Sequence, residues 1–288
     1  GVLLPLFSAV SSTSWGIGDC GDLPALGAWL ASAAFDDLML LPLGTMADGQ
    51  SSPYSACSAM AIDPLFLSIE QMEDFHRAGG INALPGAARE ALGTARAGAR
   101  IDYAAVRIAK SSALELAFAS FVKDEWALHT TRASALAAYI ARERWWLDDY
   151  ALYRALAQQY GGAWRTWPEP LATRDPHTLA EARRHFAQAM LFEQYLQWIV
   201  EGQWQHARQS LAARGIRIYG DVPFVVDTNS ADVWARADEF FLDLSAGVPP
   251  DAFSATGQDW GLPVYRWDVI AAGGFQWLRA RARRASAL

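Results

Sequence analysis

Three short apolar segments, separated by very unequal lengths of chain, constrain the fold of this sequence most strongly. Residues 1–6 and 38–43 are bounded by Pro, Gly and Ser, which is typical of short strands. Residues 23–34 between them have the pattern of a helix. A third apolar segment, residues 216–226, follows Gly215, a residue that commonly ends a helix. The order of strand, helix and strand predicts an α/β fold.

A long Ala-rich stretch separates the second predicted strand from the third, after a polar loop at residues 44–64. Two groups of apolar residues in it have helical spacing: Leu114, Ala117, Phe118 and Phe121, and Leu191, Tyr195, Trp198 and Ile199. We expect these two stripes to pack against each other rather than to bind a ligand. The sequence therefore predicts a helical insertion over residues 65–200, between two α/β segments at 1–64 and 201–288, which the family resemblance described below assigns to a barrel.

The third predicted strand begins at Ile216 and carries an aspartate near its end. Pro223 cannot donate a hydrogen bond to a neighbouring strand, so regular pairing should end near Asp221. In parallel β/α barrels, active sites form at the carboxyl ends of the strands. Residues 227–268 follow as a connection of unusual length, which predicts a functional loop. Residues 275–288 have the pattern of the next helix.

Charge and cysteine content exclude several classes of protein. Lys and Arg number 24 against 31 Asp and Glu, a net charge of −7, so we expect no nucleic-acid partner. No apolar run is long enough to span a membrane and residues 1–5 do not resemble a signal peptide, so we expect a cytoplasmic protein without a membrane partner. Cys20 and Cys57 lack zinc-site spacing and are predicted to be free, buried thiols.

Four segments of the chain form a specific combination of motifs in order and spacing. They are Gly16-Ile17-Gly18-Asp19 with Gly21; Leu40-Leu41-Pro42-Leu43 leading into Ser51-Ser52-Pro53-Tyr54 and Ser58-Ala59; Gly215-Ile216 leading into Gly220-Asp221-Val222-Pro223; and Gly247-Val248-Pro249-Pro250-Asp251-Ala252-Phe253-Ser254 followed by Gly257-Gln258 and Trp260-Gly261-Leu262-Pro263-Val264-Tyr265-Arg266-Trp267. Over nearly the whole chain, this combination resembles glycoside hydrolase family 77, the amylomaltases or disproportionating enzymes.

The resemblance implies a (β/α)8 barrel, of which this chain supplies the first three strands, with a large helical insertion between strands two and three. It also implies a 4-alpha-glucanotransferase that moves α-1,4-glucan segments between maltooligosaccharides, amylose or glycogen-derived glucans by a retaining double displacement. That reaction needs no metal and no cofactor. It needs a carboxylate nucleophile and a carboxylic acid/base roughly 5 Å apart.

The resemblance carries over six substrate-binding residues but no catalytic ones. Asp221 would hydrogen-bond the sugar beside the scissile bond, Tyr54 would stack near it, and Trp260 would line the cleft. The other three belong to the same motifs: Ser52, Pro250 and Asp251, the last in a mobile loop over the catalytic centre. Taken alone, each Asp could instead be a turn or cap residue.

The nucleophile and acid/base are expected beyond Leu288, on strands four and five, in a C-terminal half of the barrel that this chain lacks. We therefore expect residues 1–288 to be inactive by themselves. One departure from the family's usual pattern is Leu38-Met39, where many members have Trp-Gln. Two alternatives stay open: an α-glucan hydrolase of a related barrel family, and a non-catalytic glycan-binding fragment.

Overall fold

The computed structural model describes residues 1–47 and 52–288, and this part of the chain divides into two compact units. Unit 1 contains residues 1–43, 62–144 and 194–221. Unit 2 contains residues 44–61, 145–193 and 222–288. Residues of both predicted barrel segments and of the predicted insertion occur in each unit. The predicted boundaries at 64 and 200 stay a prediction.

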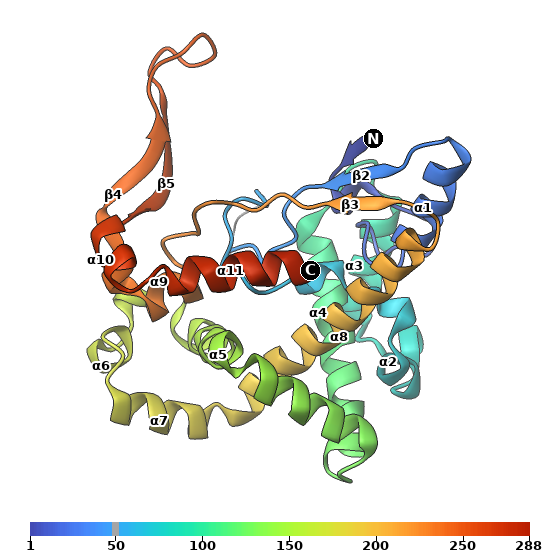
Figure 1. Ribbon diagram of the computed structural model, residues 1–288. Helices are drawn as coiled ribbons and strands as arrows, with labels where there is room; N and C mark the ends of the chain where they lie inside the picture. The colour runs from blue at the N-terminus through green and yellow to red at the C-terminus, as the bar shows by residue number, and fades with distance from the viewer. Residues whose placement is uncertain (48–51) are drawn as a thin grey trace. The chain divides into compact units, whose positions relative to one another are not determined.

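Unit 1 combines a small parallel sheet with helices (Figure 1). Its strands are β1 (Val2–Leu4), β2 (Asp37–Leu40) and β3 (Arg217–Tyr219). Its helices are α1 (Leu23–Ser32), α2 (Glu73–Arg77), α3 (Gly86–Ala97) and α4 (Tyr103–Phe121), with short helical turns at Leu6–Ser8, Pro64–Phe66, Ile69–Gln71, Gly80–Ala83 and Val122–Trp126. The long helices α5 (Thr131–Tyr160) and α8 (Ala187–Ala212) contribute residues to both units.

Unit 2 combines helices with a two-stranded antiparallel hairpin (Figure 1). Its helices are α6 (Glu169–Ala172), α7 (Pro176–His185), α9 (Ala231–Ala235), α10 (Trp267–Ala272) and α11 (Gln276–Ala287), with short turns at Trp164–Thr166 and Ala237–Glu239. The hairpin strands are β4 (Phe240–Val248) and β5 (Gln258–Tyr265). No helix among the described residues is both long and apolar enough to cross a membrane.

The three strands of unit 1 form a parallel sheet in the order β1-β2-β3, as the sequence predicted. β2 buries Leu38 and Leu40 on one face of the sheet. The opposite face presents Leu3, Met39 and Tyr219, which are directly paired neighbours in the register. These three side chains are 59%, 37% and 50% exposed, so the sheet carries an uncovered apolar row. We call Leu3, Met39 and Tyr219 the open row.

Strand boundaries differ from the prediction at both later strands. β2 ends at Leu40 rather than at residue 43, and β3 ends at Tyr219 rather than near Asp221. Pro42 and Pro223 lie just beyond these ends, and proline cannot donate to a strand ladder. Gly215 has the left-handed φ of 76° expected of a helix stop, and α8 ends at Ala212 before it.

The predicted packing of the two apolar stripes is confirmed inside unit 1. The rings of Phe118 and Phe121 on α4 lie 5.5 and 4.9 Å from the ring of Tyr195 on α8. Phe121 also lies 5.9 Å from the ring of Trp198. Helix α4 begins where the sequence provides a cap, because the side chain of Asp102 accepts a hydrogen bond from the backbone of Ala105.

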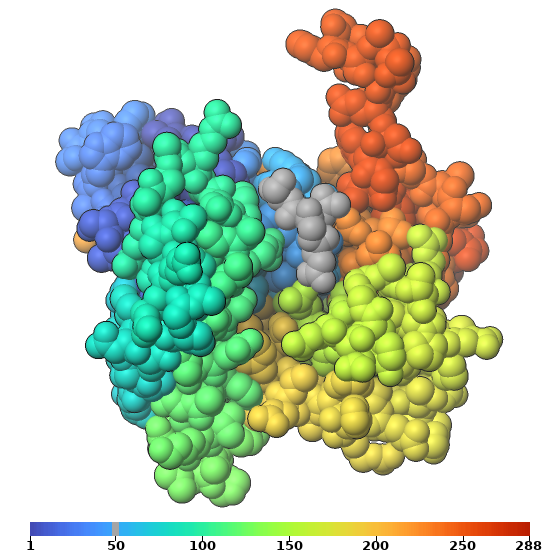
Figure 2. Space-filling model, turned by 180° about the vertical axis from the view of Figure 1, so that it is seen from behind, coloured from blue at the N-terminus to red at the C-terminus, as the bar shows by residue number. Residues whose placement is uncertain are grey.

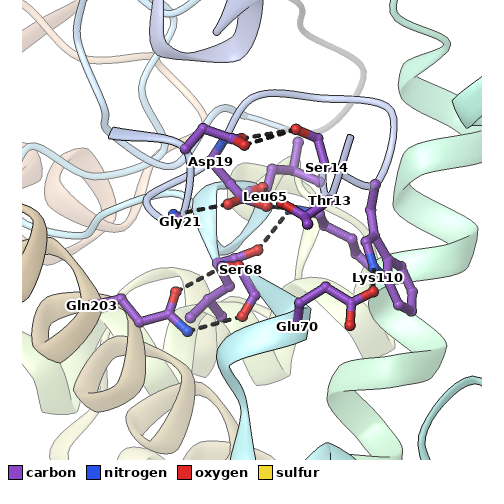
Figure 3. Close-up of polar contacts among 12 residues, drawn as sticks. Thr13, Ser14, Asp19, Gly21, Leu65, Ser68, Glu70, Lys110 and Gln203 are labelled. Carbon is purple, nitrogen blue, oxygen red and sulfur yellow. Dashed lines mark hydrogen bonds and ion pairs between the residues drawn. The ribbon is translucent and has the colours of Figure 1, made fainter. Parts of the chain in front are cut away.

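A buried lysine ties the first motif of the chain to the helices of unit 1 (Figure 3). The ammonium group of Lys110 donates to Asp19 at 3.0 Å and to the carbonyl oxygens of Leu65 and Leu67 at 2.7 Å each. Asp19 in turn accepts from the backbone of Gly21 at 3.0 Å. Burial of a charge is tolerated only with such partners, so this network fixes the loop that follows β1.

The prediction of a long connection at residues 227–268 was incomplete. The structure forms α9 and the β4–β5 hairpin there. In Figure 1 the hairpin extends away from helices α10 and α11 of its own unit, and Figure 2 shows it as a narrow projection. Cys20 and Cys57 are buried and are not joined in a disulfide bond, as predicted.

Candidate functional site

Asp221 lies just beyond the carboxyl end of β3, in unit 1. Its side chain is half-buried. The other five predicted binding residues belong to unit 2: Ser52, Tyr54, Pro250, Asp251 and Trp260. The resemblance also predicts that Asp221, Tyr54 and Asp251 converge near the carboxyl ends of the strands, and this stays a prediction.

Ser52 and Tyr54 lie in a turn of unit 2. The hydroxyl of Ser52 accepts a hydrogen bond from the backbone of Tyr54 at 3.4 Å, and its carbonyl oxygen accepts from the backbone of Ser55 at 3.1 Å. The flanking chain folds back on itself, since the backbone of Cys57 donates to Thr45 at 2.7 Å. The turn leaves Tyr54 41% exposed, so this residue is accessible to a ligand.

Pro250 and Asp251 lie at the tip of the β4–β5 hairpin and are exposed. One carboxylate oxygen of Asp251 accepts hydrogen bonds from the backbone of Phe253 and Ser254, at 2.8 and 2.7 Å. Asp251 is therefore a turn residue in this structure. This is the alternative role that the sequence left open for it. Its neighbour Phe253 is 95% exposed, so the tip presents an aromatic side chain to solvent.

Unit 2 contains a cavity of about 480 Å³. Its lining comes from the turn segment, from α5 and the loop after it, from the loop before α9, and from β5: Ala47, Ser55, Cys57, Tyr153, Arg154, Ala157, Gly162, Ala163, Asp227, Thr228, Asn229, Trp260 and Gly261. Among the six predicted residues, Trp260 is the one in this lining. The volume lies within the range of small-molecule sites, about 300–1,000 Å³.

Residues 227–229, which we call the cavity loop, are held by hydrogen bonds on several sides. The backbone of Asp227 donates to the carbonyl oxygen of Ala56 at 3.0 Å, and the indole of Trp164 donates to that of Thr228 at 2.9 Å. The hydroxyl of Thr228 donates to the carbonyl oxygen of Gly261 at 3.1 Å. The cavity loop is thereby connected to the backbone beside Trp260. This hydrogen bond fixes the position of the loop relative to β5.

Two charged side chains give the cavity its polar character. Burial raises the pKa of Asp227, opposed by the hydrogen bond that its carboxylate accepts from the backbone of Asn229. Arg154 forms an ion pair with Glu193 at 3.5 Å. Within residues 1–47 and 52–288, no group of three or more His, Cys, Asp or Glu side chains is placed to hold a metal ion.

Buried polar contacts fix the segment that continues from the turn. The backbone of Ala59 donates to the carboxylate of Asp232 at 2.6 Å, and Arg284 on α11 donates to the carbonyl oxygen of Met60 at 3.1 Å. The Arg284 guanidinium also lies 5.0 Å from the centre of the Trp146 ring. The basic residues of the last helix thus serve partly as internal supports of unit 2.

Sequence reasoning did not identify the polar lining of this cavity. Asp227 and Asn229 lie in the stretch predicted to be a functional connection, which was the available signal for them. Tyr153 and Arg154 lie within a long helix, where helical spacing indicates packing rather than ligand binding. Only the folded chain brings these four residues to one cavity.

Comparisons with known proteins agree over nearly the whole chain. A sequence model of the 4-alpha-glucanotransferase family matches residues 4–288. The 4-alpha-glucanotransferase of Thermus thermophilus is 39% identical over 250 residues, which cover 83% of this chain and 47% of that protein. The 4-alpha-glucanotransferase of Synechocystis sp. is 36% identical over 278 residues, which cover 91% of this chain and 52% of that protein.

Solved structures give the same result for the fold. The amylomaltase from Streptococcus agalactiae, in complex with acarbose, matches with a TM-score of 0.83 at 27% identity, covering 98% of this chain and 56% of that one. The amylomaltase from Corynebacterium glutamicum shares the fold with a TM-score of 0.76 at 23% identity, covering 99% and 39%. This chain spans about half the length of the curated relatives described above. It belongs to the 4-alpha-glucanotransferase family, glycoside hydrolase family 77.

Proposed function

We propose that this chain forms the donor-side wall of the sugar-binding cleft of a 4-alpha-glucanotransferase. The whole enzyme would transfer α-1,4-glucan segments between maltooligosaccharides by a retaining double displacement. The observation that carries the proposal is the family match over residues 4–288. The acarbose complex of the Streptococcus agalactiae amylomaltase supports an oligosaccharide-like ligand, with amylose and glycogen-derived glucans as the larger substrates.

The three parallel strands would be the first three of a (β/α)8 barrel, with a helical insertion between strands two and three. The open row supports this proposal, because Leu3, Met39 and Tyr219 are apolar neighbours on an uncovered face of the sheet. A soluble domain normally covers such a face. Closing the barrel would place these side chains in its interior.

The predicted binding residues have chemistry that suits glucose units. Aromatic rings such as Tyr54 and Trp260 can cover the apolar C–H faces of a sugar ring. The carboxylates of Asp221 and Asp251 can accept hydrogen bonds from sugar hydroxyl groups, and Ser52 can donate or accept. Pro250 would limit the conformations of the hairpin tip that carries Asp251.

The nucleophile and the acid/base would belong to a part of the enzyme outside these residues. Retaining transfer requires one ionised carboxylate and one protonated carboxylic acid roughly 5 Å apart, on the two sides of the scissile bond. Family resemblance assigns these groups to strands four and five. Within this proposal, residues 1–288 position the donor chain and the second half performs covalent catalysis.

The test joins residues 1–288 to the C-terminal half of the Thermus thermophilus relative and follows maltotriose products by chromatography. Transfer should give glucose together with maltooligosaccharides longer than maltotriose. The Asp221→Ala variant should lose most turnover while keeping its melting temperature. Glucose and maltose alone would instead indicate an α-glucan hydrolase, and binding of maltoheptaose without any product would indicate a glycan-binding protein.

A further inference from the structure

The cavity of unit 2 contains a carboxylate that the family motifs do not include. Asp227 is half-buried and lines the cavity with Asn229 and Trp260. Its Oδ1 accepts a hydrogen bond from the backbone of Asn229 at 2.8 Å. In the described part of the chain, its Oδ2 has no hydrogen-bond partner. A partly buried carboxylate with an unused acceptor atom can bind a donor group of a ligand.

The cavity loop is held in place before any ligand arrives. Four hydrogen bonds join it to its surroundings: from Asp227 to Ala56, from Trp164 to Thr228, from Thr228 to Gly261, and from the Tyr153 hydroxyl to the carbonyl oxygen of Asn229. A group that is already ordered loses little conformational entropy on binding. The carboxylate position is therefore set by the fold rather than by the ligand.

The chemistry of the lining favours a neutral, hydroxyl-rich ligand. The Asp227 carboxylate would repel phosphate or another anion, and the positive charge of Arg154 in the same lining is paired with Glu193 at 3.5 Å. The indole N–H of Trp260 donates to its neighbour Gln258 at 3.1 Å, which leaves the ring itself for an apolar contact. An aromatic ring, an amide and a carboxylate acceptor around one cavity are suited to a sugar, which has C–H faces and hydroxyl donors.

We propose that Asp227 is a sugar-binding residue of this cavity, whose Oδ2 accepts a hydrogen bond from a hydroxyl of a glucose unit in contact with Trp260. The inference rests on the proposed function and extends it by a residue outside the recognised motifs. Burial raises the pKa of Asp227 in the free protein, which is consistent with a carboxylate that lacks one of its hydrogen-bond donors. A sugar hydroxyl would supply that donor.

Fluorescence titration of the 288-residue chain with maltoheptaose in dilute solution tests the proposal. Asp227→Ala should weaken binding by on the order of 10- to 100-fold, the range for a hydrogen bond to a charged group. Asp227→Asn keeps the side-chain shape and an acceptor for the Asn229 backbone, so it should fold normally and show a smaller loss. The matched control is Asp243→Asn, an exposed carboxylate on β4 that is not in the cavity lining, which should bind like the unmodified chain.

The outcomes separate this inference from the proposed function. If the unmodified chain binds and Trp260→Ala loses binding, but both Asp227 variants bind within twofold of it, Asp227 has no sugar contact and the inference is wrong. If the unmodified chain does not bind maltoheptaose at all, both the inference and the donor-side role of the chain fail. Thermal melting of each variant shows whether a loss of maltoheptaose binding reflects unfolding. If Asp227→Ala is unfolded, the binding of the folded Asp227→Asn variant tests the inference instead.

Discussion

Lys110 is a buried charged residue that connects three segments in the interior of unit 1. Its side chain is 1% exposed and donates to Asp19 and to the carbonyl oxygens of Leu65 and Leu67. Lys110→Met should lower the free energy of unfolding by about 3–5 kcal/mol, because it leaves a buried carboxylate without its counter-ion. Thermal or urea unfolding measures the loss. The control is Lys123→Met, which replaces the chain's other lysine, an exposed one; equal effects of the two variants would contradict this account.

Protonation of Glu125 at low pH should reduce the stability of unit 1. Hydrogen bonds from Thr130, and then from Arg77 and Arg132, lower its pKa from 4.5 to about 2. The native state therefore favours the ionised form, so the stabilisation is present above pH 4.5 and is lost as the pH falls toward about 2. The melting temperature of the Glu125→Gln variant should therefore fall less between pH 4.5 and about 2 than that of the unmodified chain. Glu115→Gln, at an exposed position, is the control, and its melting temperature should fall as much as that of the unmodified chain. An equal fall in the Glu125→Gln variant would show that Glu125 does not contribute to the pH dependence.

Single residues differ in how well the sequence predicts their position. The position of Trp260 could be predicted, whereas the burial of Lys110 and Asp227 could not. Trp260 belongs to a motif with fixed neighbours, so its place beside a cavity could be expected. A lysine within a helix usually reaches solvent, and an aspartate in a loop usually serves a turn. Their burial depends on contacts with distant segments, which local sequence does not encode.

At the scale of elements, the pairing of β4 with β5 requires a residue without a side chain at Gly247. A Cβ atom there would lie 2.1 Å from the carbonyl oxygen of Gln258 on the paired strand. Gly247→Ala should therefore open the hairpin and increase hydrogen exchange over residues 240–265, with little change elsewhere. Gly273→Ala is the control, because its Cβ would meet only ordinary contacts at 3.5 Å. Unchanged exchange in the Gly247 variant would show that the backbone adjusts without loss of pairing.

The same hairpin explains where prediction from sequence failed. The three sheet strands were predicted because they are short apolar runs with clear boundaries. β4 and β5 have few buried positions and two irregularities in their register, so they lack the alternation that identifies a half-buried strand. Their connection, residues 249–257, also lacks the two-residue turn typical of a tight hairpin.

At the scale of the molecule, the open row predicts self-association of the isolated chain. β1 and β3 are the outer strands of the sheet, and exposed strand edges beside apolar side chains favour association. The chain should bind a hydrophobic dye and associate with increasing concentration. Tyr219→Lys should reduce both effects, whereas Trp29→Lys, at a similarly exposed aromatic on α1, should not. A monomer that melts cooperatively with little dye binding would contradict the partial-barrel proposal.

Under the proposed function, residues 1–288 form the donor-binding half of a glucanotransferase and need a second half for chemistry. Its most direct test measures maltotriose turnover by the purified chain alone and after addition of the C-terminal half of the Thermus thermophilus relative. The chain alone should give no detectable products, because losing covalent-catalysis carboxylates removes many orders of magnitude in rate. Glucose and longer maltooligosaccharides should appear only when both halves are present. Turnover that copurifies with the chain alone would contradict the account.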